Sequence, residues 1–274
     1  PIWFRWLGRL AAPLFFYALA VGFQHTRNRK KYLLRLYLAN VGMVFFNQIM
    51  CMLQRKLDYV AYQPKNHNIF TTLFCAGVLI CIWENRKEKK TFFTYIGIYI
   101  FWQAMVMGLA ILAEAFDCVW RGNALLQTVL RTNYIFPLLG GIWDAEGGVF
   151  FIVLGVWLYC AVENKWKLAL RYILFCGAYM FMCQGDILYR IMSRFSFWGY
   201  HKLADVIYFG SSFVGIPLGT SDLSLLTEFY QWMMIGALPI MLSCNGKRGK
   251  SLKWLFYAAY PLQFLVLYGI SYYK

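Results

Sequence analysis

Asn-Gly-Lys-Arg-Gly-Lys-Ser-Leu-Lys-Trp-Leu-Phe-Tyr-Ala-Ala-Tyr-Pro-Leu, residues 245–262, is the stretch that decides the fold class of this chain. Its first half is a cationic turn spaced by Gly246 and Gly249, and its second half begins an apolar, aromatic segment that runs to Tyr273. Such a turn cannot lie in hydrocarbon, whereas such a segment is typical of a spanning helix. The stretch therefore predicts a membrane boundary. Its glycines also allow a sharp turn that points several cations at one place, a geometry suited to phosphate groups.

The composition of the whole chain agrees with this boundary. Of its 274 residues, 61% are hydrophobic and only 14% are charged, against about a quarter charged in soluble domains. We expect a multi-pass membrane protein with one domain, residues 1–274, because no linker or repeat divides the chain. The net charge of +15 would suggest nucleic acid in a soluble protein. Here most cations lie in short loops between apolar runs, so we expect membrane lipid and not nucleic acid as the partner.

Apolar runs that approach the roughly 20 residues of a spanning helix predict the helices. Two further apolar stretches are interrupted: residues 124–142 contain Arg131 and Pro137, and residues 203–218 contain Gly215. The uninterrupted runs are residues 7–23, 32–53, 69–83, 92–116, 147–162, 168–183, 223–244 and 252–272.

The positions of the basic loops decide whether the two interrupted stretches cross the membrane. If neither crosses, four loops that hold 16 of the 27 Lys and Arg residues lie on one side, as the positive-inside rule requires. These loops are residues 27–35, 84–90, 163–171 and 245–253. We therefore predict an all-α, polytopic transmembrane bundle of about eight spanning helices plus two re-entrant or interfacial segments, which are tolerable only against protein or a cavity.

Several polar residues lie near the other membrane face or inside a span, where such groups are costly and often functional. Arg9 is near the start of the first span, Asn68 opens the third, and Asp144 and Glu146 precede the fifth, while Gln263 is midway along the last. Structural roles stay open for each of them: interfacial placement for Arg9, helix capping for Asn68 and Asp144, and an interhelical hydrogen bond for Gln263. No histidine spacing resembles a zinc site, so we expect no metal.

Two of the four basic loops, at residues 25–31 and 245–250, are dense cationic turns that we expect on the same side of the membrane. Together they suit the phosphates of a nucleotide-containing cofactor, because Arg and Lys form strong charge-assisted hydrogen bonds to phosphate. The alternative is that they only set topology and contact lipid head groups. The residues concerned are His25, Arg27, Arg29, Lys30, Lys31, Asn245, Lys247, Arg248 and Lys250.

Five fragments of the chain, in order, resemble the TraX family. They are Gly-Arg-Leu-Ala-Ala-Pro-Leu-Phe at 8–15, His-Thr-Arg-Asn-Arg-Lys-Lys-Tyr-Leu-Leu-Arg-Leu at 25–36, Asn-Ile-Phe-Thr-Thr-Leu at 68–73, Asn-Gly-Lys-Arg-Gly-Lys-Ser-Leu-Lys at 245–253 and Phe-Tyr-Ala-Ala-Tyr-Pro-Leu at 256–262. The family is named for the enzyme that acetylates the amino terminus of F-type conjugative pilin. It is grouped with multispanning acyltransferases that use coenzyme A.

The resemblance implies site residues. Arg9, Asn68, Tyr260 and the position of Gln263 match recurrent polar positions of the family, and with Asp144 they form the expected catalytic set. Relatives often carry His where this chain has Gln263, and they begin with a further helix that bears an Asp-His pair. Nothing before Pro1 supplies that helix: either it belongs to residues upstream of Pro1 that are missing from this sequence, or the chain lacks the Asp-His pair and its activity is in question.

The resemblance also implies an activity. We expect acetyl-CoA or another acyl-CoA to dock on the basic turns from the cytoplasm, and its acyl group to pass to an amine or hydroxyl of a pilin-like amino terminus or an envelope glycan. The implied location is the bacterial inner membrane. A non-enzymatic transporter or an assembly factor of an envelope machine is the alternative, and coenzyme A binding separates the two hypotheses.

Overall fold

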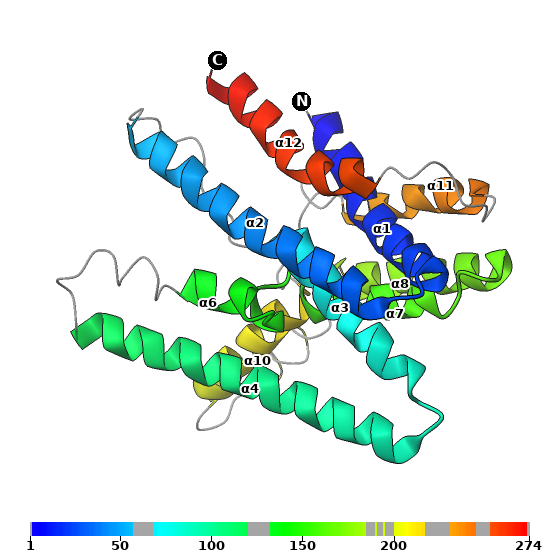
Figure 1. Cartoon of the computed structure of the whole chain (residues 1–274), viewed down its shortest axis with the longest axis horizontal. Coiled ribbons are helices and arrows are strands. Elements are labelled where there is room, and N and C mark those ends of the chain that lie inside the picture. Colours follow the sequence, from blue (N-terminus) through cyan, green and yellow to red (C-terminus); the bar gives the residue numbers. More distant parts are fainter. Residues whose placement is uncertain are drawn as a thin grey trace.

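The computed structural model describes residues 2–56, 68–119, 132–184, 190, 194, 200–216, 231–244 and 253–272. Its regular elements in these residues are all helices, joined by a single isolated bridge between Asn68 and Ala145. The all-α prediction is therefore confirmed. Figure 1 shows long helices that cross one another at several angles, with the N and C labels at the same edge of the view.

The helices have these bounds in chain order: α1 (Ile2–His25), α2 (Arg29–Lys56), α3 (Ile69–Glu84), α4 (Lys89–Val119), α6 (Thr132–Leu138), η1 (Ile142–Asp144), α7 (Gly148–Tyr159), α8 (Lys165–Gln184), α10 (Tyr200–Val214), η2 (Gln231–Gly236), α11 (Ala237–Ser243) and α12 (Lys253–Tyr272).

Three helices in the described residues are long and apolar enough to cross a membrane: α2, α4 and α8 contribute Arg29–Met50, Lys89–Ala113 and Lys165–Cys183. Shorter apolar helices are α3, α7, the η2–α11 pair and part of α12. The prediction of a membrane protein is confirmed, while the count of about eight spans stays a prediction.

The two interrupted stretches form short elements where they are described. Residues 124–142 contribute α6, which has only 7 residues, and the start of η1, while residues 120–131 lie outside the described part. The second stretch contributes most of α10, which has 15 residues. Neither element reaches the roughly 20 residues that a crossing needs. Their re-entrant or interfacial placement stays a prediction.

Contacts between the helix ends bring three basic turns to one end of the bundle, which we call the basic end. Arg29 at the start of α2 forms an ion pair of 2.8 Å with Glu84 at the end of α3. The hydroxyl of Tyr159, at the end of α7, donates to the same carboxylate at 2.5 Å. Lys165, at the start of α8, donates to the carbonyl of Leu242 in α11 at 2.8 Å. The predicted sharing of one face is thus reproduced for the turns after α1, α3 and α7.

The centre of the bundle is α3, which packs against α1, α2 and α7. Small residues make these contacts possible, as is usual between membrane helices. A Cβ on Gly77 would lie 2.8 Å from the side chain of Leu33 in α2, and one on Gly155 would lie 2.8 Å from Ala76 in α3. Close packing around α3 therefore fixes where its first residue, and the segment beside it, lie within the bundle.

Candidate functional site

An irregular segment, residues 139–147, lies among the helices between α6 and α7; we call it the junction. Gly140 and Gly147 have φ values of 65° and 77°, which favour glycine because a Cβ is strained there. Gly147 is also the N-cap of α7 and offers no side chain to cap it. The chain therefore turns sharply at both ends of the junction, and α7 starts beside the start of α3, where Ala145 pairs with Asn68.

Side chains from α2, α3 and α4 donate hydrogen bonds to backbone carbonyls of the junction and of the end of α6 that precedes it. Irregular backbone at membrane depth needs such partners, because no water is there to supply them. The donors and accepting carbonyls are Asn40 to Pro137 at 2.5 Å, Tyr37 to Leu138 at 2.7 Å, Trp102 to Leu139 at 3.0 Å, Gln103 to Gly140 at 3.2 Å and Thr72 to Glu146 at 3.2 Å. The junction is therefore held in one conformation by its surroundings.

Asn68 belongs to this supporting network. Its Oδ1 accepts a hydrogen bond from the backbone N–H of Thr71 at 3.0 Å, which makes it the N-cap of α3. Its Nδ2 donates to Oδ1 of Asn40 at 2.9 Å, and the side chain is only 1% exposed. Of the two roles that the sequence left open for Asn68, the structure shows capping, and it adds a hydrogen bond that joins α3 to α2.

One acidic group of the junction is paired with a residue from the far end of the chain. The hydroxyl of Tyr260 in α12 donates to Oε2 of Glu146 at 3.0 Å. Tyr260 is buried, and its ring centroid lies 5.6 Å from that of Phe70 and 5.0 Å from that of Phe264, whereas Glu146 is exposed. A fixed phenol thus orients a carboxylate that a bound molecule can reach.

Arg9 approaches the same region from α1. It is half-buried on a helix that packs against α7, and it lies near the hydroxyl of Tyr179 in α8. That hydroxyl donates to the carbonyl of Gly215 at 3.1 Å. The backbone of Gly215 in turn packs on Gly147, since a Cβ on Gly215 would lie 2.0 Å from the Gly147 carbonyl oxygen. Arg9 and Tyr179 therefore belong to the surroundings of the junction.

The structure does not show the side chains of the other two predicted catalytic residues at the junction in the same way. Asp144 lies in η1, inside the junction, but its side chain lies outside the described part of the structure. Gln263 is on α12, three residues after Tyr260, and its side chain is exposed where that of Tyr260 is buried. The structure thus brings Arg9, Asn68 and Tyr260 to the junction, together with Glu146.

The predicted phosphate-binding residues fall into three groups. Arg29 is half-buried and engaged: it donates to the carbonyl of Thr26 at 2.7 Å, pairs with Glu84 and lies 5.4 Å over the ring of Phe23. The residues around it, His25, Arg27, Lys30 and Lys31, are exposed at the basic end. The remaining four, Asn245, Lys247, Arg248 and Lys250, lie outside the described residues.

The described structure resumes with α12 at Lys253, and the first turn of this helix packs against α1 and α3. Phe256, in the first turn of α12, packs edge-on against Phe15 of α1 with the ring centroids 4.9 Å apart. Phe256 also lies against Phe70 of α3, at 6.5 Å. The start of α12 is therefore fixed against the middle of α1 and the first turn of α3.

Among the members of the supporting network that sequence reasoning missed are two buried amides, Asn40 and Gln103. Both are neutral amides inside long apolar runs, and both are buried, at 0% and 4% exposure. A polar residue in such a position carries a desolvation cost that a partner must offset, and that was the available signal. Gln103 both donates to Gly140 and accepts from the backbone N–H of Ile142 at 2.9 Å, so it closes the turn of the junction.

Comparison with protein families gives one match. A family model described as TraX protein matches residues 1–179, more than half of the chain. The match runs from α1 to Tyr179 in α8 and so includes Arg9, Asn68 and the junction, while Tyr260 and Gln263 lie beyond it. Comparison with curated proteins and with solved structures gave no match.

Proposed function

The chain belongs to the TraX family, and on that premise we propose that it is a membrane-embedded acyltransferase. It moves an acetyl or other short acyl group from acyl-CoA on the cytoplasmic side to an amine or hydroxyl acceptor at the membrane, such as a pilin-like amino terminus or an envelope glycan. One observation carries the proposal: the exposed carboxylate of Glu146, oriented by the hydroxyl of Tyr260 at 3.0 Å, in a junction that the bundle holds in place.

The chemistry is a direct transfer. The acceptor nitrogen or oxygen attacks the thioester carbonyl, so a C–N or C–O bond forms and the C–S bond breaks. Glu146 takes the acceptor proton as general base, and the thiolate of coenzyme A leaves and receives that proton. The products are the acylated acceptor and coenzyme A thiol. Tyr260 keeps the carboxylate oriented during the proton transfer.

The surrounding residues supply position and charge. Arg9, which lies near the Tyr179 hydroxyl beside the junction, stabilises the oxyanion that develops on the thioester carbonyl. Asn68 and Asn40 act through the backbone that they hold and so are positioning residues. Holding the reacting groups at a fixed geometry contributes to the rate because their freedom is lost before the reaction begins.

The donor enters from the basic end. Arg27, Lys30 and Lys31 are exposed there, and the sequence adds Arg248, which lies outside the described residues. These cations bind the phosphates of acyl-CoA. Arg29 does not have this role in our proposal, because its guanidinium already binds Glu84 and the carbonyl of Thr26.

The first experiment measures transfer of labelled acetyl from acetyl-CoA into native membrane extract by the purified protein. Glu146→Gln should lower the rate by about 10²–10⁴-fold, the usual contribution of a general base. Glu163→Gln, a matched change at an exposed acid of the basic end, should leave the rate unchanged. Equal rates for wild type and Glu146→Gln would overturn the assignment of the base.

The second experiment tests the donor. Acetyl-CoA binding to the purified protein should weaken when the 3′-phosphate is absent, and Arg248→Glu should weaken it while size-exclusion elution is unchanged. Absence of both transfer and coenzyme A binding would overturn the acyltransferase. It would favour a transporter or an assembly factor, in which the irregular junction lines a pathway.

A further inference from the structure

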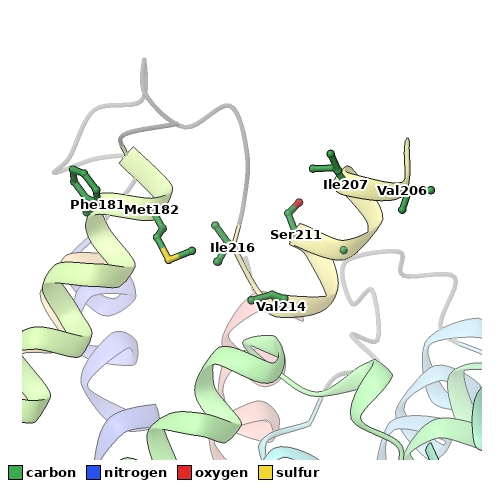
Figure 2. A pocket seen from close by; sticks show the side chains of 8 residues that line it. Phe181, Met182, Val206, Ile207, Ser211, Val214 and Ile216 are labelled. Atoms are coloured by element: carbon green, nitrogen blue, oxygen red, sulfur yellow. The ribbon is translucent and has the colours of Figure 1, made fainter. Parts of the chain in front are cut away.

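A cavity of about 590 Å³ lies between the last turn of α8 and the second half of α10. In Figure 2, Phe181 and Met182 of α8 face Ile207 and Ser211 of α10 across it, and Ile216 lies between the two helices. The volume is in the range of sites for small ligands, roughly 300–1,000 Å³.

The side chains that line the cavity in the described part of the structure are almost all apolar and suit hydrocarbon. Among the described residues that line it, Ser211 contributes the one side-chain hydroxyl, which donates to the carbonyl of Tyr208 in its own helix at 2.9 Å. The other side chains around it are apolar: Phe181, Met182, Val206, Ile207, Val214 and Ile216. A polar ligand would lose its hydration here without gaining a partner. The lining therefore suits an aliphatic chain.

The cavity lies far from the basic end, and a lysine is exposed at its edge. Met182 is 17 residues along α8 from Lys165, which is about 25 Å at 1.5 Å per residue, so the cavity lies in the membrane half away from the basic end. Lys202 is exposed and precedes Val206 by one helical turn, so it lies at the edge of the same face of α10. A cation beside an apolar cavity is complementary to an amphiphile that has a hydrocarbon chain and an anionic head group.

From these observations we propose that the α8–α10 cavity binds one hydrocarbon chain of an anionic phospholipid, with Lys202 at its phosphate. This inference does not depend on acyl transfer. It has a consequence for the junction, because Val214 and Ile216 in the cavity wall flank Gly215. A Cβ on Gly148 would lie 2.5 Å from the Gly215 nitrogen, so a chain in the cavity supports the contact between the end of α10 and the start of α7.

Photo-crosslinking tests the proposal. The purified full chain in detergent is mixed with phosphatidylglycerol that carries a diazirine in one acyl chain, illuminated and mapped by mass spectrometry. Adducts should concentrate on peptides that contain residues 181–182 and 206–216. Adducts spread evenly over the lipid-facing surfaces of α2 and α4 would overturn the site.

Two glycines offer a matched pair of variants, since a Cβ on either Gly210 or Gly177 would meet no atom within 4 Å. Gly210 lines the cavity and Gly177 is exposed elsewhere on α8. Gly210→Leu fills the space of several methylene groups and should reduce cavity adducts by on the order of tenfold. Gly177→Leu should not change them. Unchanged adducts in Gly210→Leu, with wild-type circular dichroism and elution, would overturn the proposal.

The head group is tested without touching the cavity. Lys202→Gln should reduce the preference for phosphatidylglycerol over phosphatidylcholine with the same chains by about fivefold, the effect expected of one lysine at an anionic surface. Lys167→Gln, at an exposed lysine of the basic end, should leave it unchanged. Because Lys202 is on the surface, this variant keeps the proposal testable even if Gly210→Leu does not fold. A preference that survives in Lys202→Gln would overturn the anionic head group.

Discussion

The two ends of α3 use polar side chains in different ways. At the junction, Asn40 and Thr72 are 0% exposed, neutral, and bonded to backbone carbonyls. At the basic end, Arg29 and Glu84 are 28% and 30% exposed and bonded to each other. A buried group that loses its partner bears the full cost of desolvation, whereas an ion pair near water is worth little. Neutral hydrogen bonds should therefore contribute more to this fold than its charges.

The largest loss of stability in this comparison should come from Asn40→Leu, which replaces the amide with an apolar side chain of similar volume. It leaves the Pro137 carbonyl, the Asn68 amide and the Thr71 hydroxyl without the partner that Asn40 supplies. We expect a loss of about 2–3 kcal/mol in the free energy of unfolding, at about 1 kcal/mol for each bond. Unfolding with a denaturing detergent in mixed micelles measures it.

The control for Asn40→Leu is Gln24→Leu at the basic end. Gln24 donates to Glu163 at 3.4 Å in an exposed position, so its replacement should cost no more than about 0.5 kcal/mol. Equal losses for the two variants would remove the distinction between the two ends of the bundle.

A smaller effect is expected for Thr72→Val, which removes one hydroxyl and keeps the shape. Its hydrogen bond to the Glu146 carbonyl contributes about 1 kcal/mol to stability. Because that carbonyl belongs to the proposed base, acetyl transfer should slow by more than stability alone explains. Thr94→Val on α4 is the control, since the Thr94 hydroxyl binds the carbonyl of Lys90 in an exposed position. A transfer rate that Thr72→Val does not change would separate Glu146 from the catalysis.

The smallest loss of stability among these substitutions should come from Glu84→Gln. It removes the ion pair with Arg29 and leaves an amide oxygen that still accepts from the Tyr159 hydroxyl. We expect a loss of about 0.2–1 kcal/mol in unfolding free energy at low salt, shrinking toward zero at 1 M salt because the pair is partly exposed. A loss above that of Asn40→Leu, or one that salt does not reduce, would contradict the comparison.

The membrane class and the helical fold could be read from the sequence because apolar runs and basic loops follow from local composition. The common end of the turns after α1, α3 and α7 followed from the charge rule. The network of the junction could not be read in the same way, since Asn40 and Pro137 are 97 residues apart and meet only through the packing around α3. Their pairing depends on which faces of the helices are in contact.

The candidate site was predictable in part, for a similar reason. Arg9, Asn68 and Glu146 were noticed because each is polar beside an apolar run. The environments of Tyr260 and Gln263 could not be told apart, because α12 is apolar on all sides and its sequence does not say which face is buried. Likewise, nothing local distinguishes Arg29 from its neighbouring cations; its partner Glu84 is 55 residues away.

The parallel course of α3 and α7 has an electrostatic consequence. Both helices begin at the junction, where Asn68 pairs with Ala145, and both end at the basic end, where Tyr159 meets Glu84. Their macrodipoles therefore point the same way, with two partial positive ends beside the carboxylate of Glu146 and two partial negative ends beside the basic turns. Two aligned dipoles repel each other. The acid at one end and the cations at the other offset that repulsion, so the uneven charge of the chain also holds its central helices side by side.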